Sequence, residues 1–386
     1  MIRLSNSPIK FNEPYLTGNE ETYIKDVFKR KQFYGNGYYT QRCQALISEK
    51  ILVENVLLTD SCTSALEISA LLLREWDKEQ EIILPSYTFS STAAAFARAG
   101  FKIIFAEIDP QTMMIDIEDA KNKITAQTVA IVVVHYGGFG ANAILFKELC
   151  NDNSIYLIED AAQAFGCVEG DHCLGTIGDL GCYSFHETKN LHAGLSGTLV
   201  INNDKFIDRA AHIWERGTNR QEVLKGLADK YSWVEIGGSF YPTELQAAFL
   251  CAQLESFDMN FIERKDIFFG YYDFFINNNI ADFYYPKISD NFQTNFHAFW
   301  VVFASSEECD YVRLKLVDNK ISAYIGYVPL HSSKVGINMG YAPEDLMITE
   351  EYAQRILRLP MHNNMNKDES TYIAKSIIKY IKEYRK

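Results

Sequence analysis

Seven short apolar runs, rich in β-branched residues, recur through the first half of this 386-residue chain. Several of them are separated by segments with helical spacing of apolar residues, such as Ala65–Trp76 and Ile117–Ile124. Continuous apolar runs of this length are typical of strands buried on both faces of a sheet that helices cover. We therefore predict an α/β fold with a seven-stranded, mostly parallel sheet. The predicted strands are Val56–Thr59, Glu81–Pro85, Lys102–Asp109, Ala130–Tyr136, Ser154–Asp160, Cys182–Phe185 and Thr198–Asn202.

The composition of the sequence changes near residue 255, where aromatic residues become frequent. Gln246–Phe257 reads as a long helix, and the aromatic-rich segments F-F-G-Y-Y-D-F-F and F-H-A-F-W-V-V-F follow it. A last helix is expected at about Glu369–Lys386. We predict a large domain over residues 1–255 and a smaller α+β domain over residues 256–386.

Charge and composition exclude several classes of function. The chain carries 50 acidic and 37 basic residues, a net charge of −13, and no basic block beyond Phe28–Lys31. Nucleic acid and membrane surfaces are therefore not expected as partners. No run approaches the roughly 18 apolar residues of a membrane span, and the N-terminus lacks a signal-peptide pattern, which predicts a cytoplasmic protein. The 8 cysteines never form C-x-x-C, which argues against zinc and disulfide frameworks.

The residues that follow the predicted strands form a distinctive set. Ligands of open α/β sheets collect beyond the carboxyl ends of the strands. The segments at these positions are D-S-C-T-S (60–64), P-S-Y-T-F-S-S-T (85–92), H-Y-G-G (135–138), E-D-A-A-Q (159–163) and H-E-T-K-N (186–190). Together they offer hydroxyls, an aromatic ring, a carboxylate, an amide and a single lysine. This combination suits pyridoxal phosphate.

Each part of that cofactor has a candidate partner. Lys189 would form the imine with the aldehyde and later carry protons, and Asp160 would keep the pyridine nitrogen protonated. Phe89 would stack on the ring, and Gln163 would reach the phenolic oxygen. Thr63 and Ser64 precede the helix expected from Ala65, so their hydroxyls and the free N–H groups would surround the phosphate. The alternative for Ser64-x-x-Glu67 is a capping box.

The sequence resembles the sugar aminotransferases of the DegT/DnrJ/EryC1/StrS family over nearly its whole length. The matching segments include D-S-C-T-S-A-L-E (60–67), I-E-D-A-A-Q (158–163), S-F-H-E-T-K-N (184–190), R-G-T-N-R (216–220), D-K-Y-S-W (229–233), V-P-L-H (328–331) and L-R-L-P-M (357–361). The resemblance implies fold type I of the pyridoxal-phosphate enzymes and a nucleotide-linked keto sugar as substrate. S-F-H-E-T-K-N and R-G-T-N-R are most similar to the branch that converts dTDP-4-keto-6-deoxyglucose to dTDP-4-amino-4,6-dideoxygalactose with L-glutamate as amino donor.

The resemblance implies the same roles for the residues already named and adds two more. Ser184 would help Thr63 and Ser64 to hold the phosphate. Such enzymes are homodimers with shared active sites, and by position Ser239 would reach the partner subunit's phosphate. The family usually has asparagine there and arginine where this chain has Tyr241. After the lysine, Gly194-Leu195-Ser196-Gly197 replaces the usual G-E-G-G, which is expected to make a positive φ harder to reach at position 196.

Substrate contacts are expected from two further groups of residues. Local charge suggests that the diphosphate of the substrate meets some of Arg30, Arg42, Arg220, Lys225 and Lys230, and the alternative is that these side chains are solvated. The resemblance implies a sugar contact for His331, where the smaller domain closes over the site. His186, beside the lysine, would contact the sugar or pack.

The expected activity is a ping-pong transamination for surface glycan biosynthesis, such as that of lipopolysaccharide. Alternatives remain within the family: amination of a 3-keto sugar, or a product of gluco configuration. A sugar 3-dehydratase has histidine in place of the lysine, so Lys189 argues against it. A non-catalytic protein that binds a nucleotide sugar is a further alternative, because of the altered Gly194–Gly197 loop.

Overall fold

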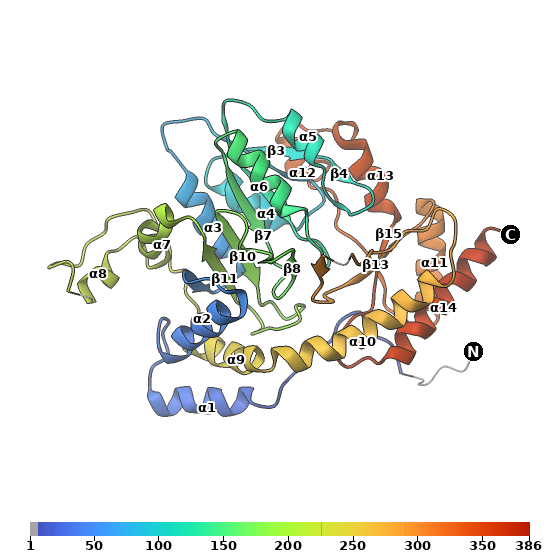
Figure 1. The fold of residues 1–386 in the computed structure, drawn as a ribbon, viewed down its shortest axis with the longest axis horizontal. Coiled ribbons are helices and arrows are strands. Elements are labelled where there is room, and N and C mark those ends of the chain that lie inside the picture. Colours follow the sequence, from blue (N-terminus) through green and yellow to red (C-terminus); the bar gives the residue numbers. More distant parts are fainter. Residues whose placement is uncertain (1–6, 225, 290) are drawn as a thin grey trace.

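The seven predicted strands form one sheet in the computed structural model, which describes residues 7–224, 226–289 and 291–386 (Figure 1). The order across the sheet is β1-β11-β10-β7-β6-β2-β3. All neighbours pair in parallel except β11, which is antiparallel to both β1 and β10. The strands are β1 Val56–Thr59, β2 Glu81–Pro85, β3 Lys102–Ala106, β6 Thr128–Val134, β7 Tyr156–Asp160, β10 Leu180–Ser184 and β11 Gly197–Ile201. The predicted mostly parallel α/β sheet is confirmed.

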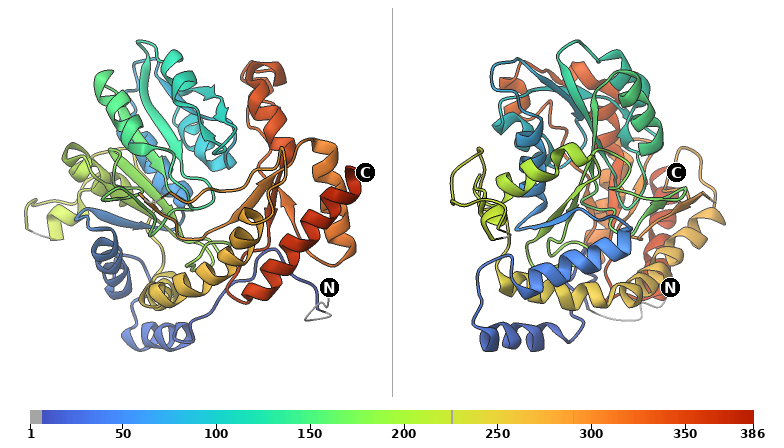
Figure 2. Two further views of the ribbon diagram at one scale, coloured as in Figure 1. Left: turned by 45° about the vertical axis from the view of Figure 1, so that its right-hand side comes forward. Right: turned by 60° about the vertical axis from the view of Figure 1, so that its left-hand side comes forward.

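Both faces of the sheet are buried, as the continuous apolar runs predict. Along β6, Ala130 and Val132 pack into one apolar cluster, whereas Ile131 and Val133 pack into another. Helices α3, α4 and α7 cover the first face, and α5 and α6 cover the second (Figure 2). The helices of this part are α1 Glu20–Arg30, α2 Tyr38–Ile51, α3 Cys62–Leu73, α4 Ser90–Arg98, α5 Ile117–Asn122, α6 Ala143–Asp152, α7 Ile207–Trp214, α8 Arg220–Leu224 and α9 Glu244–Glu255.

One predicted strand is shorter than expected. The run Lys102–Asp109 divides into β3 and β4 (Ile108–Asp109), and β4 pairs with β5 (Met114–Ile115) outside the main sheet. Glu107 lies between them, and its carboxylate accepts hydrogen bonds from the backbone N–H groups of Ile348 and Thr349. The prediction of one continuous strand is wrong here, because Glu107 turns away to bind a distant segment.

The C-terminal part forms a second, smaller sheet with the order β13-β15-β14. Helix α10 follows α9 directly after Ser256, close to the boundary that the sequence predicts. The N-terminal segment also reaches this part, because Ile9 bridges Ile321 and the Phe11 carbonyl accepts from Met361 N–H. The elements are β13 Phe299–Val302, β14 Tyr324–Ile325, β15 Ile356–Leu359, α10 Phe257–Ile276, α11 Ser306–Asp318, α12 Lys334–Asn338, α13 Met347–Arg355 and α14 Lys367–Tyr384. A third small sheet contains β8 Val168–Glu169, β9 His172–Cys173 and β12 Phe292–Gln293.

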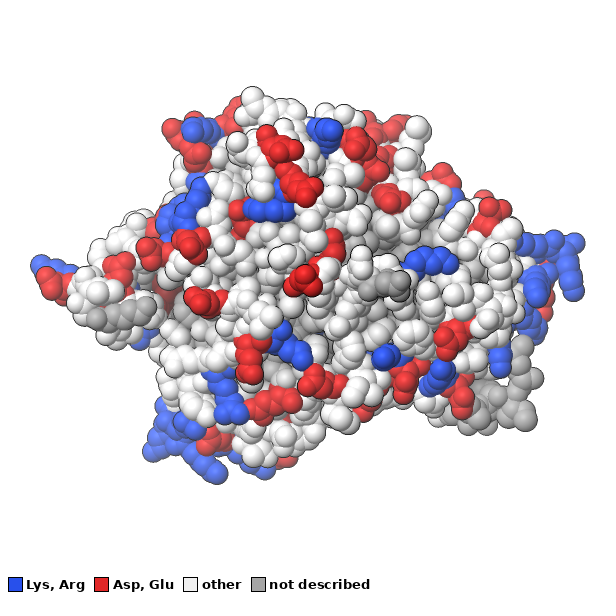
Figure 3. Space-filling model, viewed as in Figure 1, with Lys and Arg blue, Asp and Glu red and all other residues white. Residues whose placement is uncertain are grey.

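Charges of both signs are interspersed over the face of the molecule drawn in Figure 3. Within the described ranges, no helix has both the length and the apolar character needed to cross a bilayer. The described residues also contain no group of three or more His, Cys, Asp or Glu side chains placed to hold a metal ion.

A buried carboxylate joins α2 to α9. Glu244, only 1% exposed, accepts hydrogen bonds from the backbone N–H groups of Gly37, Tyr39 and Thr40 at 2.9, 2.8 and 3.2 Å. Gly37 is the N-cap of α2 and has no side chain to satisfy these groups, so the carboxylate from α9 caps the helix. The negative charge is also favourable at the positive end of the helix.

We predict that Glu244→Gln lowers the free energy of unfolding by about 2 kcal/mol, because hydrogen bonds to a charged acceptor contribute more than those to a neutral one. Urea-induced unfolding of the variant and the wild type measures the difference. Glu21→Gln, at an exposed glutamate on α1, is the matched control and is expected to change little. Equal stability of the Glu244→Gln variant and the wild type would contradict this account of the cap.

Candidate active site

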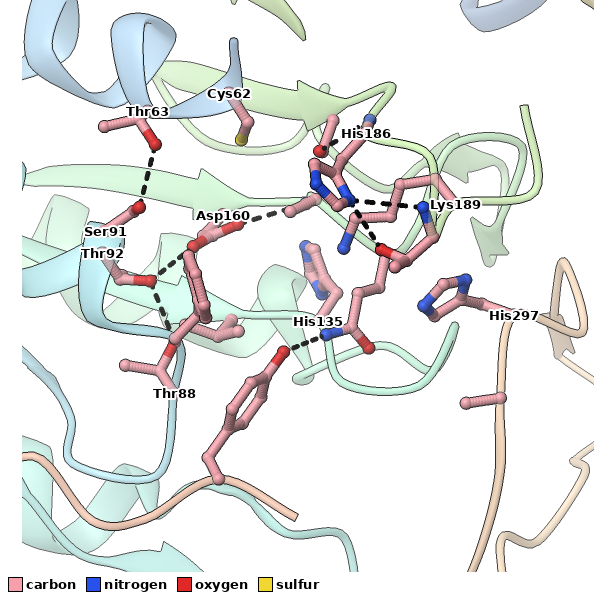
Figure 4. A pocket seen from close by; sticks show the side chains of 18 of the residues that line it. Cys62, Thr63, Thr88, Ser91, Thr92, His135, Asp160, His186, Lys189 and His297 are labelled. Carbon is pink, nitrogen blue, oxygen red and sulfur yellow. Dashed lines mark hydrogen bonds between the residues drawn. The ribbon is translucent and has the colours of Figure 1, made fainter. Parts of the chain in front are cut away.

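A cavity of about 470 Å³ lies at the edge of the main sheet where β2, β6, β7 and β10 end. Segments from both parts of the chain line it, as Figure 4 shows in part. Its size is in the usual range for a small-molecule site. The residues that line it include Ser61, Cys62, Thr63, Thr88, Phe89, Ser91, Thr92, His135, Asp160, Gln163, Ser184, His186, Lys189, Leu195, His297, Tyr327 and Arg358.

Lys189 extends into this cavity from the turn after β10. Burial lowers the pKa of its amine to about 8, the positive charge of Arg358 acts in the same direction, and Cys62 and Asp160 oppose the change. An amine with this pKa has a far larger neutral fraction near physiological pH than an ordinary lysine. Lys189 can therefore act as a nucleophile and as a base.

Asp160 is the last residue of β7 and faces the same cavity. Its Oδ2 accepts a hydrogen bond from Thr92 Oγ1 at 2.7 Å, and its Oδ1 accepts from Ala162 N–H at 3.1 Å. Because the Thr92 hydroxyl donates to Asp160, the hydroxyl of Thr88, 2.9 Å away, donates to Thr92 (Figure 4). Burial raises the pKa of Asp160. A cationic ligand beside the carboxylate would offset this effect and favour the ionised form.

Hydroxyl groups gather at the N-terminus of α3. This helix begins at Cys62, with Ser61 as N-cap, three residues earlier than the sequence suggests. Ser61, Thr63, Ser91 and Ser184 line the cavity there, and Thr63 Oγ1 donates to Ser91 Oγ at 2.8 Å. The first N–H groups of a helix have no helical acceptor, so this end can bind an anion.

The prediction for Ser64 needs correction. Its hydroxyl donates to the Asp60 carboxylate, its N–H donates to Ser61 Oγ, and it does not line the cavity. The capping-box alternative is also wrong, because Ser64 lies inside the helix and Ser61 caps it. Ser64 therefore supports the start of α3, and Ser61 takes its place in the cavity wall.

These residues fit pyridoxal phosphate. Lys189 and Asp160 line one cavity and no ion pair joins them, so both remain for a ligand that carries an aldehyde and a ring nitrogen. Gly197 packs so closely on the start of α3 that a Cβ there would lie 2.3 Å from the Cys62 nitrogen. Only glycine allows this approach, which holds the end of α3 where a phosphate can reach it.

The loop after the lysine differs from the expectation. Among Gly194, Leu195, Ser196 and Gly197, only Gly194 has a positive φ, at 72°. The expected difficulty at Ser196 is wrong, because that residue does not adopt the left-handed conformation. Instead Ser196 is fully buried and its hydroxyl donates to the Thr59 carbonyl at 3.0 Å, which ties β11 to β1. The altered loop is therefore compatible with a formed site.

The remaining predicted cofactor residues lie around the lysine and the carboxylate. Gln163 lines the cavity, accepts from Gly137 N–H at 2.8 Å and donates to Tyr327 Oη at 2.7 Å. Phe89 precedes α4, lines the cavity and remains 59% exposed. Ser239 does not line the cavity of its own subunit. Its contact with a partner subunit stays a prediction.

The predicted substrate residues divide into two groups. His186 lines the cavity, and burial together with Lys189 lowers its pKa. His331 is fully buried outside the cavity, where Nδ1 lies 2.7 Å from Ser86 Oγ and Nε2 faces Glu350. The predicted sugar contact of His331 is therefore not supported, because the ring supports the loop after β2 instead.

The described candidate diphosphate ligands do not line the cavity. Arg30 pairs with Asp26, Arg42 with Glu255, and Arg220 with Glu215. Lys230 lies in the segment after α8, and Lys225 is outside the described residues. Their role stays a prediction, which a second subunit would have to complete.

Several cavity residues have no place in the sequence-based prediction. Thr88, Ser91, Thr92 and His135 belong to the segments after strands that were singled out, so their position carried a signal. His297, Tyr327 and Arg358 come from the C-terminal part, and Arg358 lies within the L-R-L-P-M motif. Nothing local in the sequence places these three beside Lys189.

We predict that the rate at which cofactor-free protein combines with pyridoxal phosphate rises with pH and reaches half its maximum near pH 8. The neutral amine of Lys189 is the nucleophile, and its pKa of about 8 replaces the ordinary 10.5. The growth of visible absorption after mixing measures this rate, and Lys189→Ala is the control that should give none. A midpoint at the ordinary value would contradict the effect of burial.

Known proteins resemble the chain in both sequence and fold. The model of the DegT/DnrJ/EryC1/StrS aminotransferase family matches residues 14–378. GDP-perosamine synthase of Escherichia coli O157:H7 is 28% identical, covering 95% of this chain and 96% of that protein. The dTDP-4-amino-4,6-dideoxy-D-glucose transaminase of Shigella dysenteriae is 28% identical, covering 96% of this chain and 98% of that protein. The crystal structure of the aminotransferase TlmJ from Streptoalloteichus hindustanus superimposes with a TM-score of 0.88 at 24% identity, covering 98% of this chain and 100% of that one. The chain is a pyridoxal-phosphate-dependent aminotransferase and belongs to the DegT/DnrJ/EryC1/StrS family.

Proposed function

We propose that this enzyme transfers the amino group of L-glutamate to C4 of dTDP-4-keto-6-deoxyglucose. The products are 2-oxoglutarate and dTDP-4-amino-4,6-dideoxygalactose, a sugar for a surface glycan such as lipopolysaccharide. The observation that carries the proposal is a single cavity that holds Lys189, Asp160 and the hydroxyl groups at the start of α3, in a family of sugar aminotransferases. The motifs around Lys189 and at Arg216–Arg220, which are most similar to this branch of the family, support this choice of substrate.

Pyridoxal phosphate, when bound, supplies an aldehyde that carries the amino group and a ring that accepts electrons from the carbon that loses its proton. Lys189 holds the cofactor and, once released, its neutral Nζ takes the proton from Cα of the donor and delivers it again. Asp160 binds the ring nitrogen, with Thr92 and Ala162 N–H fixing the carboxylate. Thr63, Ser184 and the first N–H groups of α3 bind the phosphate.

Two more residues orient the ring in this proposal. Phe89 covers one face of it, and Gln163 directs its amide toward the phenolic oxygen, held by Gly137 N–H and Tyr327. His186, next to the lysine, contacts the sugar. Asp160 is only 4% exposed, and this burial strengthens its electrostatic contacts within the cavity.

A second candidate product is dTDP-4-amino-4,6-dideoxyglucose, which the name of the Shigella dysenteriae relative favours. The two products differ only in the configuration at C4. That configuration depends on which face of the sugar carbon receives the proton from Lys189.

We expect the purified enzyme to convert dTDP-4-keto-6-deoxyglucose completely with excess L-glutamate, and NMR coupling constants of the product to give an axial amine at C4. Lys189→Ala should form no product over repeated turnovers, although it should still bind the nucleotide sugar. An equatorial amine would replace the galacto assignment with the gluco one. An amine at C3, or no product from any nucleotide-linked keto sugar, would refute the proposal.

The homodimer is the second part of the proposal. An arm comprising residues 219–236, without residue 225, projects from the main body at α8, as Figures 1 and 2 show. Leu227 and Trp233 on this arm are 76% and 75% exposed, and Leu224 and Tyr231 are also largely exposed. Large apolar side chains on a projecting segment favour burial against another surface. The second copy of the chain would cover the arm and receive Ser239, with Arg220 and Lys230, beside its own cavity.

We predict that replacing both Leu227 and Trp233 with aspartate halves the native molecular mass and abolishes transamination, because two charges oppose burial of the arm. Light scattering coupled to size-exclusion chromatography measures the mass. Trp76→Asp alters a tryptophan that is 57% exposed outside the arm, and it should leave both properties unchanged. A fully dimeric double variant would exclude the arm as the interface.

A further inference from the structure

Arg358 brings a guanidinium into the cavity that nothing in the described chain neutralises. It lies in β15, between Trp300 on β13 and Tyr324 on β14, and it lines the cavity. Its Nε is buried without a hydrogen-bond partner, and no ion pair of the described residues includes it. The guanidinium carbon lies over the ring of Phe11, 5.3 Å from the ring centroid.

Other buried arginines of this part are satisfied by the protein itself. The guanidinium of Arg264 donates to the carbonyls of Phe296, His297 and Met361. Arg355, three residues before Arg358, donates to the Phe303 carbonyl and pairs with Glu351. A guanidinium has five N–H donors, and leaving them unsatisfied in a buried place is costly. The exception at Arg358 therefore points to a partner that the protein receives from outside.

The environment of Arg358 keeps it charged. Burial alone would lower its pKa, but the hydroxyls of Tyr136, Tyr327 and Tyr87 raise it above the ordinary value. A charged guanidinium in the wall of a cavity can bind a carboxylate or a phosphate by paired hydrogen bonds. The ligand is therefore an anion.

Three anionic groups enter this site under the proposed function: the cofactor phosphate, the substrate diphosphate and the donor carboxylates. The phosphate belongs at the start of α3, where Thr63 and Ser184 gather. Arg358 comes instead from β15 of the second sheet, where it pairs with Trp300 and Tyr324, and it lines the same cavity as Lys189. Arg358 thus lies on the side of Lys189 that faces the second sheet.

The distance along each substrate distinguishes the other two anions. The α-carboxylate of an amino acid is bonded to the carbon that carries the amine, so it must lie next to the position of the Lys189 amine. The diphosphate of the nucleotide sugar is separated from the reacting carbon by most of a sugar ring and lies farther out. A cation that lines the same cavity as Lys189 and acts on its amine therefore matches the α-carboxylate.

We propose that Arg358 binds the α-carboxylate of the amino-acid donor through its guanidinium fork, an assignment that rests on the proposed transamination. Binding has a consequence for the base. The free guanidinium lowers the pKa of Lys189, so pairing it with a carboxylate offsets that effect. The donor thereby increases the basicity of the amine that removes its own proton. Arg358 is thus a donor-binding residue at the cavity wall opposite the phosphate site.

The test uses the holoenzyme and 2-methyl-L-glutamate, which binds like a donor but has no proton on Cα. Its dissociation constant, from the change in cofactor absorption, is expected to rise about 10- to 100-fold in Arg358→Gln, as for loss of hydrogen bonds between charged groups. Arg358→Lys should recover part of the affinity, because it keeps the charge but not the fork. Calorimetric titration with dTDP should give the same affinity in wild type and both variants.

Amide analogues of the donor identify which carboxylate is bound. For L-isoglutamine, whose α-carboxylate is an amide, the rate of donor-driven loss of visible absorption should be equally low in wild type and Arg358→Gln. For L-glutamine, whose side-chain carboxylate is an amide, the full penalty of the variant should persist. The reverse pattern would assign Arg358 to the side-chain carboxylate and overturn the proposal.

Arg355→Gln is the matched control, because it removes a nearby guanidinium that does not line the cavity. It should melt at a lower temperature but bind 2-methyl-L-glutamate normally. Unchanged affinity in Arg358→Gln, or a selective loss of dTDP or of the cofactor, would overturn the proposal. A wild type that reacts with glutamate but aminates no keto sugar would refute the sugar assignment and leave the role of Arg358 intact.

Discussion

A buried carboxylate at the end of β7 holds the centre of the sheet together. Glu159 is fully buried and accepts hydrogen bonds from the N–H groups of Gly175, Ile177 and Gly178 at 2.7, 2.7 and 2.6 Å. It also pairs with His135 Nε2 at 2.9 Å, while His135 Nδ1 accepts from Ala141 N–H. One carboxylate therefore fixes the loop before β10 and the loop after β6. A buried charge with this many donors is well compensated.

The neighbouring residue on the same strand faces the opposite way. Successive side chains of a strand alternate between the two faces of the sheet, so Glu159 and Asp160 point to opposite sides. Glu159 organises the backbone on one side, and Asp160 presents its carboxylate to the cavity on the other, where α4 supplies Thr92. The alternation of side chains along the strand therefore gives Glu159 and Asp160 different surroundings and different roles. Glu159 thereby anchors the loops on either side of the strand that carries Asp160.

The second sheet completes the cavity. β15 contributes Arg358, and the segment after β14 contributes Tyr327. The hydroxyl of Tyr327 accepts a hydrogen bond from the Gln163 amide. Lys189 therefore shares its cavity with a carboxylate from the main sheet and a guanidinium from the smaller one. Burial lowers its pKa to about 8, with Arg358 adding to the effect. The reactivity of the lysine is a property of the assembled cavity rather than of its own segment.

The sequence predicted the main sheet, because apolar periodicity fixes strands. It also placed Lys189, Asp160 and Gln163 after strand ends, and the structure brings them into one cavity because strand ends meet at one edge. It failed where distant contacts decide the local structure. Glu107 interrupts a predicted strand to bind Thr349, Ser61 starts α3 before Ser64, and His331 is held by Ser86 rather than exposed to the cavity. In each case a side-chain hydrogen bond overrides the local pattern.

By itself, the sequence determined the fold class, the cofactor and the edge of the sheet where the candidate residues meet. Only the tertiary structure decided which residues from the C-terminal part join them, above all Arg358, and that its charge has no partner within the described chain. The physical reason is that strand ends are brought together by backbone pairing, which follows from local pattern. The approach of the second sheet depends on side-chain packing between segments far apart in the chain, and no local pattern encodes it.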